Sequence, residues 1–223
     1  MGGGTLMEAE FVKEGCKGLL SWSEYSNLVN IRPLVEEKRV NILNGPGWTW
    51  KCTNWNTEYN SYPASIMEEA LENYICYVED MSRCTKRVNE YAAYLEEQYG
   101  RQVSAHIYTC RNIDIPHPFG THYDYHDNVI VQCEGQSNFK VWPKITITKD
   151  RNLLLNYFFD GATKERKDTP LLDVTMNPGD VIAIPKYYPH LATSNTKRMS
   201  ISFPIADDPI TDVQEDRHWI ELD

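Results

Sequence analysis

Apolar side chains recur at helical spacing in one part of the chain, residues 65–99. Between residues 65 and 81 they stand three or four positions apart, which places them on one face of an α-helix. Ser65, with Glu68 three residues later, fits a capping box at the start of this helix. A second helix is predicted from Thr85 to Tyr99, because its apolar residues share one face and Gly100 stands where a helix ends. We interpret both apolar stripes as faces that pack on the core.

Short apolar stretches separated by turn residues make up most of the remaining chain. Two strands are predicted before the helices, at 39–43 and 48–50, on either side of the turn at 44–47. After Gly100 the pattern predicts strands at residues 103–110, 128–133, 137–142, 145–148, 153–159, 171–176, 181–184 and 198–205. Glu134-Gly135 is predicted to be the tight turn of a hairpin. Many short strands after a helical region predict an α+β, mainly β fold: a barrel or sandwich with the helices on one face.

The composition limits the class of protein. A length of 223 residues suits one domain, with a strand and helix region at about 1–100, a β core at about 101–206 and a tail at 207–223. The net charge of -10 argues against a protein that binds the nucleic-acid phosphate backbone, because such proteins carry a basic face. No apolar run approaches the ~18 residues of a membrane span, and the first residues lack the features of a signal peptide. The six cysteines form no CxxC pair, so we expect reduced cysteines and a cytoplasmic protein.

The segment 120–128 concentrates side chains that bind metals. His122 and Asp124 stand two residues apart, so on an extended backbone they point to the same side and can share one metal ion. Asp127 has the opposite parity to His122, so we do not place it in the metal site. His126 has the same parity as Asp124 but lies one step further along, so we expect it beside the site or facing a substrate.

A third ligand follows much later in the chain. His190 comes after the apolar strand 181–184 and a loop bracketed by Pro185 and Pro189. Two histidines and one carboxylate form a facial triad, which leaves three positions of the metal open. Such a site suits Fe(II), with a co-substrate and O2 in the open positions.

Two stretches resemble the JmjC/cupin-like Fe(II)- and 2-oxoglutarate-dependent oxygenases, in their hydroxylase branch. The first is Thr121-His122-Tyr123-Asp124 with Asn128, Gln132, Gly135 and Lys140-Val141-Trp142-Pro143. The second runs from Leu171 to Asp180 and continues through Ile184-Pro185 to His190. The resemblance implies a double-stranded β-helix, also called a cupin or jelly-roll barrel, with the N-terminal helices packed on one face. It also implies that His122, Asp124 and His190 bind Fe(II), that 2-oxoglutarate and O2 are co-substrates, and that succinate and CO2 are released as a substrate is hydroxylated.

One position departs from the family pattern. JmjC relatives often carry a lysine or arginine two residues after the hairpin glycine, where this chain has Ser137. Lys140 is a poor replacement, because the parity of the predicted hairpin turns it to the opposite face. Arg198 and Ser200 resemble the Arg-x-Ser pair of other 2-oxoglutarate oxygenases, so we expect them to hold the distal carboxylate of the co-substrate.

Asn128 and Tyr108 are predicted as further contacts in the co-substrate pocket, by their position and their capacity for hydrogen bonds. The sequence favours a dioxygenase that hydroxylates a protein side chain or a small molecule. Two other classes stay open. One is a metal-dependent cupin enzyme that acts on a small molecule without 2-oxoglutarate, which Ser137 favours and Arg198 opposes. The other is a non-catalytic cupin-fold binding module, which three converging metal ligands oppose.

Overall fold

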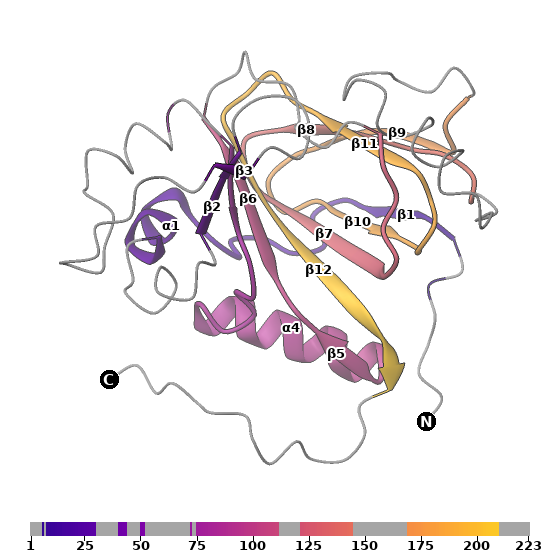
Figure 1. Ribbon diagram of the computed structural model, residues 1–223, viewed down its shortest axis with the longest axis horizontal. Coiled ribbons are helices and arrows are strands. Elements are labelled where there is room, and N and C mark those ends of the chain that lie inside the picture. Colours follow the sequence, from indigo (N-terminus) through magenta and orange to yellow (C-terminus); the bar gives the residue numbers. More distant parts are fainter. Residues whose placement is uncertain are drawn as a thin grey trace.

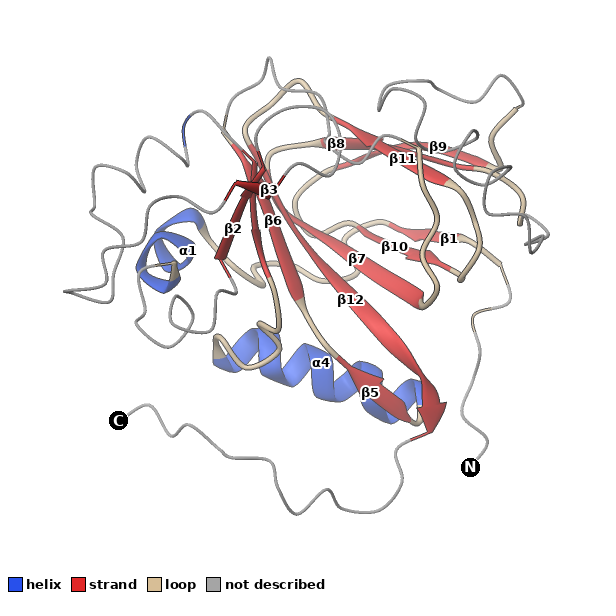
Figure 2. Ribbon diagram, viewed as in Figure 1, coloured by secondary structure: helices blue, strands red, loops and turns tan. Residues whose placement is uncertain are grey.

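A computed structural model describes residues 6, 8–29, 40–43, 50–51, 72, 75–111, 121–144 and 169–209. The predicted capping box at Ser65 and Glu68, the turn at 44–47 and the strands 145–148 and 153–159 lie outside these residues. In the part of the chain that is described, strands outnumber helices and the fold is mainly β, as expected (Figure 2). No helix among these residues combines the length and the hydropathy that a membrane span needs.

Two antiparallel sheets form the barrel (Figure 1). The major sheet has the order β1-β10-β7-β12-β6-β4-β2-β3, with β5 also paired to β12. Its strands are β1 Glu10–Val12, β2 Val40–Leu43, β3 Trp50–Lys51, β4 Ile75–Val78, β5 Arg101–Val103, β6 His106–Cys110, β7 Asp127–Glu134, β10 Val181–Ile184 and β12 Arg198–Pro209. The minor sheet has the order β11-β8-β9, with the strands β8 Ser137–Val141, β9 Leu172–Met176 and β11 His190–Thr193. The two sheets face each other as in a double-stranded β-helix.

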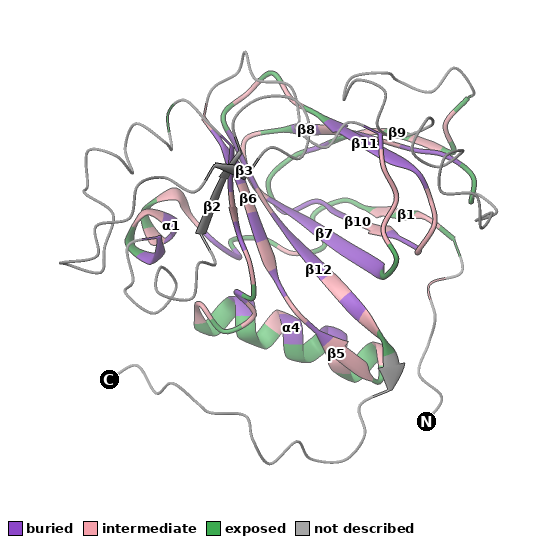
Figure 3. Cartoon of the chain, in the orientation of Figure 1, coloured by how far each residue is buried: buried purple, intermediate pink, exposed green. Residues whose placement is uncertain are grey.

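Helices cover the outer face of the major sheet. Helix α4 spans Lys86–Tyr99; the Thr85 hydroxyl caps its first turn by accepting from the Val88 N–H, and Gly100 ends it at a φ of 64°. The prediction of this helix is confirmed. Its buried residues face the sheet while the opposite side is exposed (Figure 3). Helix α1 spans Trp22–Leu28 and begins with a capping box between Ser21 and Glu24.

The two faces of the major sheet have different characters. On β12, Met199, Ile201 and Phe203 join the helices in one apolar core. Side chains alternate along a strand, so Arg198, Ser200 and Ser202 point to the other face, toward the minor sheet. A second apolar cluster fills part of the space between the sheets, formed by Ile130, Phe139, Val141, Met176, Ile182, Ile184 and Ala192. The barrel interior is therefore apolar beside β10 and polar beside β12 and β6.

The predicted helix at 65–81 is wrong over its last turns, because Ile75–Val78 forms strand β4. This strand lies between β2 and β6, so it gains hydrogen bonds to two neighbours. Ile75 and Tyr77 join an inner cluster while Cys76 and Val78 join the outer core, which is the alternation of a strand buried on both faces. Pairing with strands that are distant in sequence therefore gives this segment a β conformation, despite the helical spacing of its apolar residues.

The predicted hairpin between β7 and β8 is also wrong, although both strands exist. Strand β7 pairs with β10 and β12 in the major sheet, whereas β8 pairs with β11 and β9 in the minor one. Gly135, at a φ of 64°, lets the chain cross from one sheet to the other. A Cβ atom there would lie 1.7 Å from the carbonyl oxygen of Lys197, so the crossing requires glycine.

Smaller differences concern strand bounds. The predicted strand 103–110 is two strands, β5 and β6, separated by Ser104 and Ala105. Strand β12 extends to Pro209, past the expected end at 205. Strands β1 to β4 come from the expected N-terminal region, yet they belong to the same sheet as the core strands. The five cysteines in the described part of the chain are free thiols, and burial raises the pKa of Cys76 to about 12, which keeps it protonated.

Candidate metal centre

The backbone brings the predicted metal ligands together. His122 and His190 form an isolated bridge in which the His122 N–H donates to the His190 carbonyl at 3.0 Å and the His190 N–H returns the bond at 2.7 Å. Their imidazole rings lie 4.3 Å apart between centroids. Asp124 follows two residues after His122, on the same short segment before β7. Two backbone hydrogen bonds therefore join parts of the chain that are far apart in sequence.

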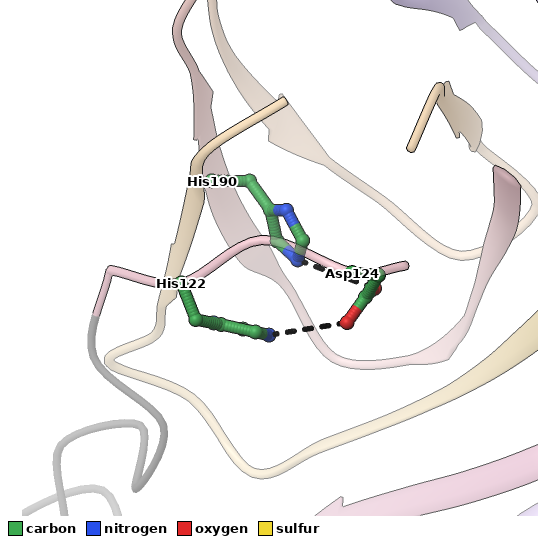
Figure 4. A group of neighbouring side chains, drawn as sticks. All are labelled: His122, Asp124 and His190. Atoms are coloured by element: carbon green, nitrogen blue, oxygen red, sulfur yellow. Dashed lines mark ion pairs between the residues drawn. The ribbon is translucent and has the colours of Figure 1, made fainter. Parts of the chain in front are cut away.

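The three side chains converge on one point (Figure 4). Nε2 of His122 lies 4.0 Å from Oδ1 of Asp124, and Nε2 of His190 lies 3.8 Å from Oδ2. With one ligand atom taken from each residue, the three atoms lie within 4.8 Å of one another, close to the ~4.2 Å that separates two atoms when each binds the same ion at ~2.1 Å. Among the described residues, these three form the one group of potential ligands close enough to hold a metal. His126 is exposed, and the buried Asp127 accepts from the Lys186 N–H instead.

The protonation of His190 suits metal binding. Burial, and after it the positive charge of a protonated His122, lowers the pKa of His190 to about 4, so the imidazole is neutral at pH 7. Its Nδ1 lies 3.1 Å from the Tyr188 carbonyl, which can only accept, so Nδ1 carries the proton. The lone pair is then on Nε2, the atom that faces Asp124.

The charge of Asp124 also suits metal binding. Burial acts to raise its pKa, but the two imidazoles and a hydrogen bond from Asn128 outweigh this and hold the pKa below its usual range. The site thus offers one anionic oxygen donor and neutral imidazole nitrogen. This donor set fits a divalent transition metal such as Fe(II).

A pocket between the sheets contains three of the four residues predicted to hold the co-substrate. Arg198, Ser200 and Tyr108 line it with Ser137, Phe139 and Ala192. Ala192 lies two residues after His190, so the pocket begins roughly 7 Å along β11 from the metal ligand.

Arg198 is 6% exposed, and its Nη1 atom has no hydrogen-bond partner among the described residues. Burial lowers its pKa, as expected for a cation surrounded by protein. A buried guanidinium nitrogen without a hydrogen-bond partner is costly unless a ligand supplies an acceptor. The pocket therefore fits an anionic ligand such as a carboxylate.

Two other positions considered for anchoring the co-substrate carboxylate fit that role less well than Arg198. Ser137, at the position where relatives often carry a cation, lies in the pocket but is small and neutral. Lys140 lies outside it, with its ammonium 3.8 Å from a carboxylate oxygen of Asp173. The expectation that Lys140 leaves the inner face therefore agrees with the structure, although the hairpin that suggested it does not exist.

Asn128, the fourth predicted residue, is not among the residues that line this pocket. Its Nδ2 donates to Oδ2 of Asp124 at 3.1 Å, and its Oδ1 accepts from the Ser202 hydroxyl at 2.7 Å. Ser202 was not among the site residues predicted from the sequence. Its spacing of two from Ser200 was the available signal.

A second group on the inner face includes two residues that the sequence did not indicate, Tyr77 and His106, beside the predicted Tyr108. The Tyr77 hydroxyl lies 2.6 Å from Nδ1 of His106, and the Tyr77 ring stacks on Tyr108 with centroids 4.6 Å apart. Tyr77 and Tyr108 are direct partners across β4 and β6. The helical interpretation of residues 65–81 concealed this pair, since only a strand places Tyr77 beside Tyr108.

Known proteins similar to this chain include members of a family of oxygenases. A family model described as the JmjC domain matches residues 78–213. A protein from Caenorhabditis briggsae, described as bifunctional lysine-specific demethylase and histidyl-hydroxylase NO66, is 26% identical over 190 residues, which are 84% of this chain and 24% of that protein.

Solved structures of the Escherichia coli protein YcfD share the fold. One has a TM-score of 0.58 at 15% identity, with 92% of this chain and 51% of that chain covered. Another, described as a ribosomal oxygenase in complex with cobalt and 2-oxoglutarate, has a TM-score of 0.56 at 16% identity, with 91% and 49% covered. This chain thus spans about a quarter of the length of the curated relative and about half of the solved ones.

Proposed function

The chain belongs to the JmjC-domain family, and from this we propose that it is an Fe(II)- and 2-oxoglutarate-dependent oxygenase that hydroxylates a polypeptide side chain. The observation that carries the proposal is the pairing of two sites in one barrel. Three metal ligands converge at one end, and a buried guanidinium with one unpartnered nitrogen lies in the adjoining pocket. A metal site alone would fit many cupins, whereas the anion pocket beside it fits a dicarboxylate co-substrate.

His122, Asp124 and His190 would hold the iron. When bound, Fe(II) supplies the site at which O2 and 2-oxoglutarate react, giving succinate and CO2 while one oxygen atom enters a substrate C–H bond. The chain's own task is to leave metal positions open and to hold both organic reactants in place. No protein general base is needed for this reaction.

Arg198 and Ser200 would bind the distal carboxylate of 2-oxoglutarate. They lie at consecutive inward positions of β12, so a guanidinium N–H and a hydroxyl can donate to the same carboxylate. Tyr108 lies directly opposite Ser200 on β6 and adds a phenol to the same wall. Phe139 and Ala192 complete the pocket with apolar surface, which limits water around the ion pair.

Tyrosines at the rim favour a polypeptide substrate. Tyr123 and Tyr125 flank Asp124, and the Tyr187 ring lies 6.2 and 6.1 Å from theirs. Tyr125 is 60% exposed, and exposed aromatic rings are enriched at protein interfaces. The Tyr187 N–H donates to the Asp124 carbonyl at 2.9 Å, so the rim is fixed to the metal segment. The relatives' descriptions, a histidyl-hydroxylase and a ribosomal oxygenase, point the same way.

Turnover of 2-oxoglutarate tests the proposed function. The purified chain with Fe(II), ascorbate and labelled 2-oxoglutarate should form succinate slowly in air and none under argon, because turnover without a substrate is inefficient but still requires O2. A substrate peptide in a proteolysed cell extract should accelerate succinate formation and gain the mass of one oxygen atom.

Lys140→Ala is the matched control, because it removes a cation that faces away from the pocket. Its rate of succinate formation should equal that of the unmodified chain. Succinate formation that persists without iron or without O2 would refute the proposed reaction.

A further inference from the structure

Ser202, Asn128 and Asp124 form a chain of hydrogen bonds that ends on a metal ligand; we call these three residues the amide relay. Asn128 and Ser202 are both buried. They lie diagonally on the neighbouring strands β7 and β12, since Ser202 pairs with Ile130, two residues from Asn128. The relay thus joins the segment that carries Asp124 to the strand that carries Arg198 and Ser200.

The direction of each hydrogen bond is fixed by chemistry. An ionised carboxylate can only accept, so the Asn128 atom 3.1 Å from Asp124 must be the amide nitrogen. The amide oxygen then faces Ser202, whose hydroxyl must donate to it at 2.7 Å. In the amide relay, Ser202 therefore donates to Asn128, and Asn128 donates to Asp124.

The relay also distinguishes the two oxygens of Asp124. Oδ2 accepts a hydrogen bond from Asn128, whereas Oδ1 accepts none from the described side chains and faces Nε2 of His122 at 4.0 Å. An oxygen that already accepts a hydrogen bond is a weaker metal donor than its free partner. Oδ1 is therefore the better placed oxygen for a metal, and single-oxygen binding by Asp124 leaves the other metal positions open.

We propose that Asn128 and Ser202 are positioning residues, which orient Asp124 through the amide relay so that it binds the metal through one oxygen. The proposal rests on the proposed metal site but not on 2-oxoglutarate or on turnover. It assigns Asn128 to the metal ligand and away from the co-substrate pocket, where the sequence had placed it. Residues that orient a metal ligand typically change metal affinity by about 10- to 100-fold when removed.

Metal binding by the chain without co-substrate provides the test. Asn128→Leu keeps the volume of the side chain and removes its amide, so the dissociation constant for Mn(II), measured by calorimetry, should rise by about 10- to 100-fold. Ser202→Ala removes one neutral hydrogen bond and should raise it by roughly 2- to 10-fold, while Ser202→Thr retains the hydroxyl and should restore the original value. The visible spectrum of the Co(II)-loaded chain should change with Asn128→Leu, because the carboxylate is free to bind differently.

A double-mutant cycle separates a relay from two independent structural roles. In the Asn128→Leu background Ser202→Ala should have no further effect on Mn(II) affinity, since the link through which it acts is gone. Asn138→Leu is the matched control: it also removes an asparagine-to-aspartate hydrogen bond, to Asp173 at 3.0 Å, on the exposed side of β8. It should leave Mn(II) affinity and the Co(II) spectrum unchanged.

Two results would overturn the relay. One is an unchanged Mn(II) affinity in Asn128→Leu, and the other is independent, multiplicative effects of the two substitutions. If the unmodified chain binds Mn(II) but forms no succinate, the proposed oxygenase fails while the relay stands. If the unmodified chain binds no divalent metal, both fail.

Discussion

Replacing His190 with alanine is expected to abolish metal binding and all iron-dependent succinate formation. His190 is buried, and its Nδ1–H bond to the Tyr188 carbonyl directs Nε2 at Asp124. Loss of a ligand should weaken Mn(II) binding by more than the roughly 100-fold that loss of a ligand's neighbour can cause. Calorimetry with Mn(II) and the succinate assay measure both effects.

Folding should survive this substitution, because the His122–His190 bridge consists of backbone hydrogen bonds that alanine also makes. The melting temperature of the metal-free chain is the check. His126→Ala is the matched control, since His126 lies on the same segment but is exposed and outside the ligand group. Mn(II) affinity that falls with His126→Ala and persists with His190→Ala would show that the third ligand is assigned to the wrong histidine.

Replacing Arg198 with alanine is expected to raise the KM for 2-oxoglutarate, which is the second largest effect that we expect. Truncating one partner of a buried, hydrogen-bonded charge pair costs about 2–5 kcal/mol, which is roughly 30-fold or more in affinity. Arg198→Lys keeps the charge but not the planar fork of donors, so its KM should lie between that of the unmodified chain and that of Arg198→Ala. Steady-state kinetics of succinate formation at varied 2-oxoglutarate give these values.

Metal binding should be retained in Arg198→Ala, because the guanidinium is not one of the converging ligands. The stability of the chain without ligand should not fall either, since the substitution removes a buried guanidinium nitrogen that lacks a partner in the described structure. Lys140→Ala again serves as the control with an unchanged KM. A KM that rises with Lys140→Ala and not with Arg198→Ala would place the anchor on β8 instead of β12.

The ligand segment was predictable because its signal is local. His122 and Asp124 share a face by parity alone, and His190 follows a strand whose bounds, Val181–Ile184, the apolar run gave correctly. Arg198 and Ser200 on β12 were predicted from their resemblance to the Arg-x-Ser pair of other 2-oxoglutarate oxygenases. Parity gives the face of a strand but not its neighbours, so it could not show that Asn128 contacts Asp124 while Arg198 contacts the pocket.

Errors arose where the fold depends on distant pairing. Consecutive strands usually pair with each other, yet β7 and β8 belong to different sheets because Gly135 turns the chain across the barrel. Likewise, β4 is a strand because β2 and β6 are available to it, which no local pattern reveals. Helix α1 is different: its capping box at Ser21 and Glu24 is a local signal in the sequence, although no helix was predicted there.

Anaerobic titration of 2-oxoglutarate into the Fe(II)-loaded chain tests the central claim most directly, because it requires the metal site and the anion pocket together. A weak visible absorption band should appear and saturate with the unmodified chain. It should be absent with His190→Ala and require roughly 30-fold more 2-oxoglutarate, or still higher concentrations, with Arg198→Ala. Tight Fe(II) binding with no band at any concentration of 2-oxoglutarate would contradict the oxygenase and leave a metal-binding cupin that does not use this co-substrate.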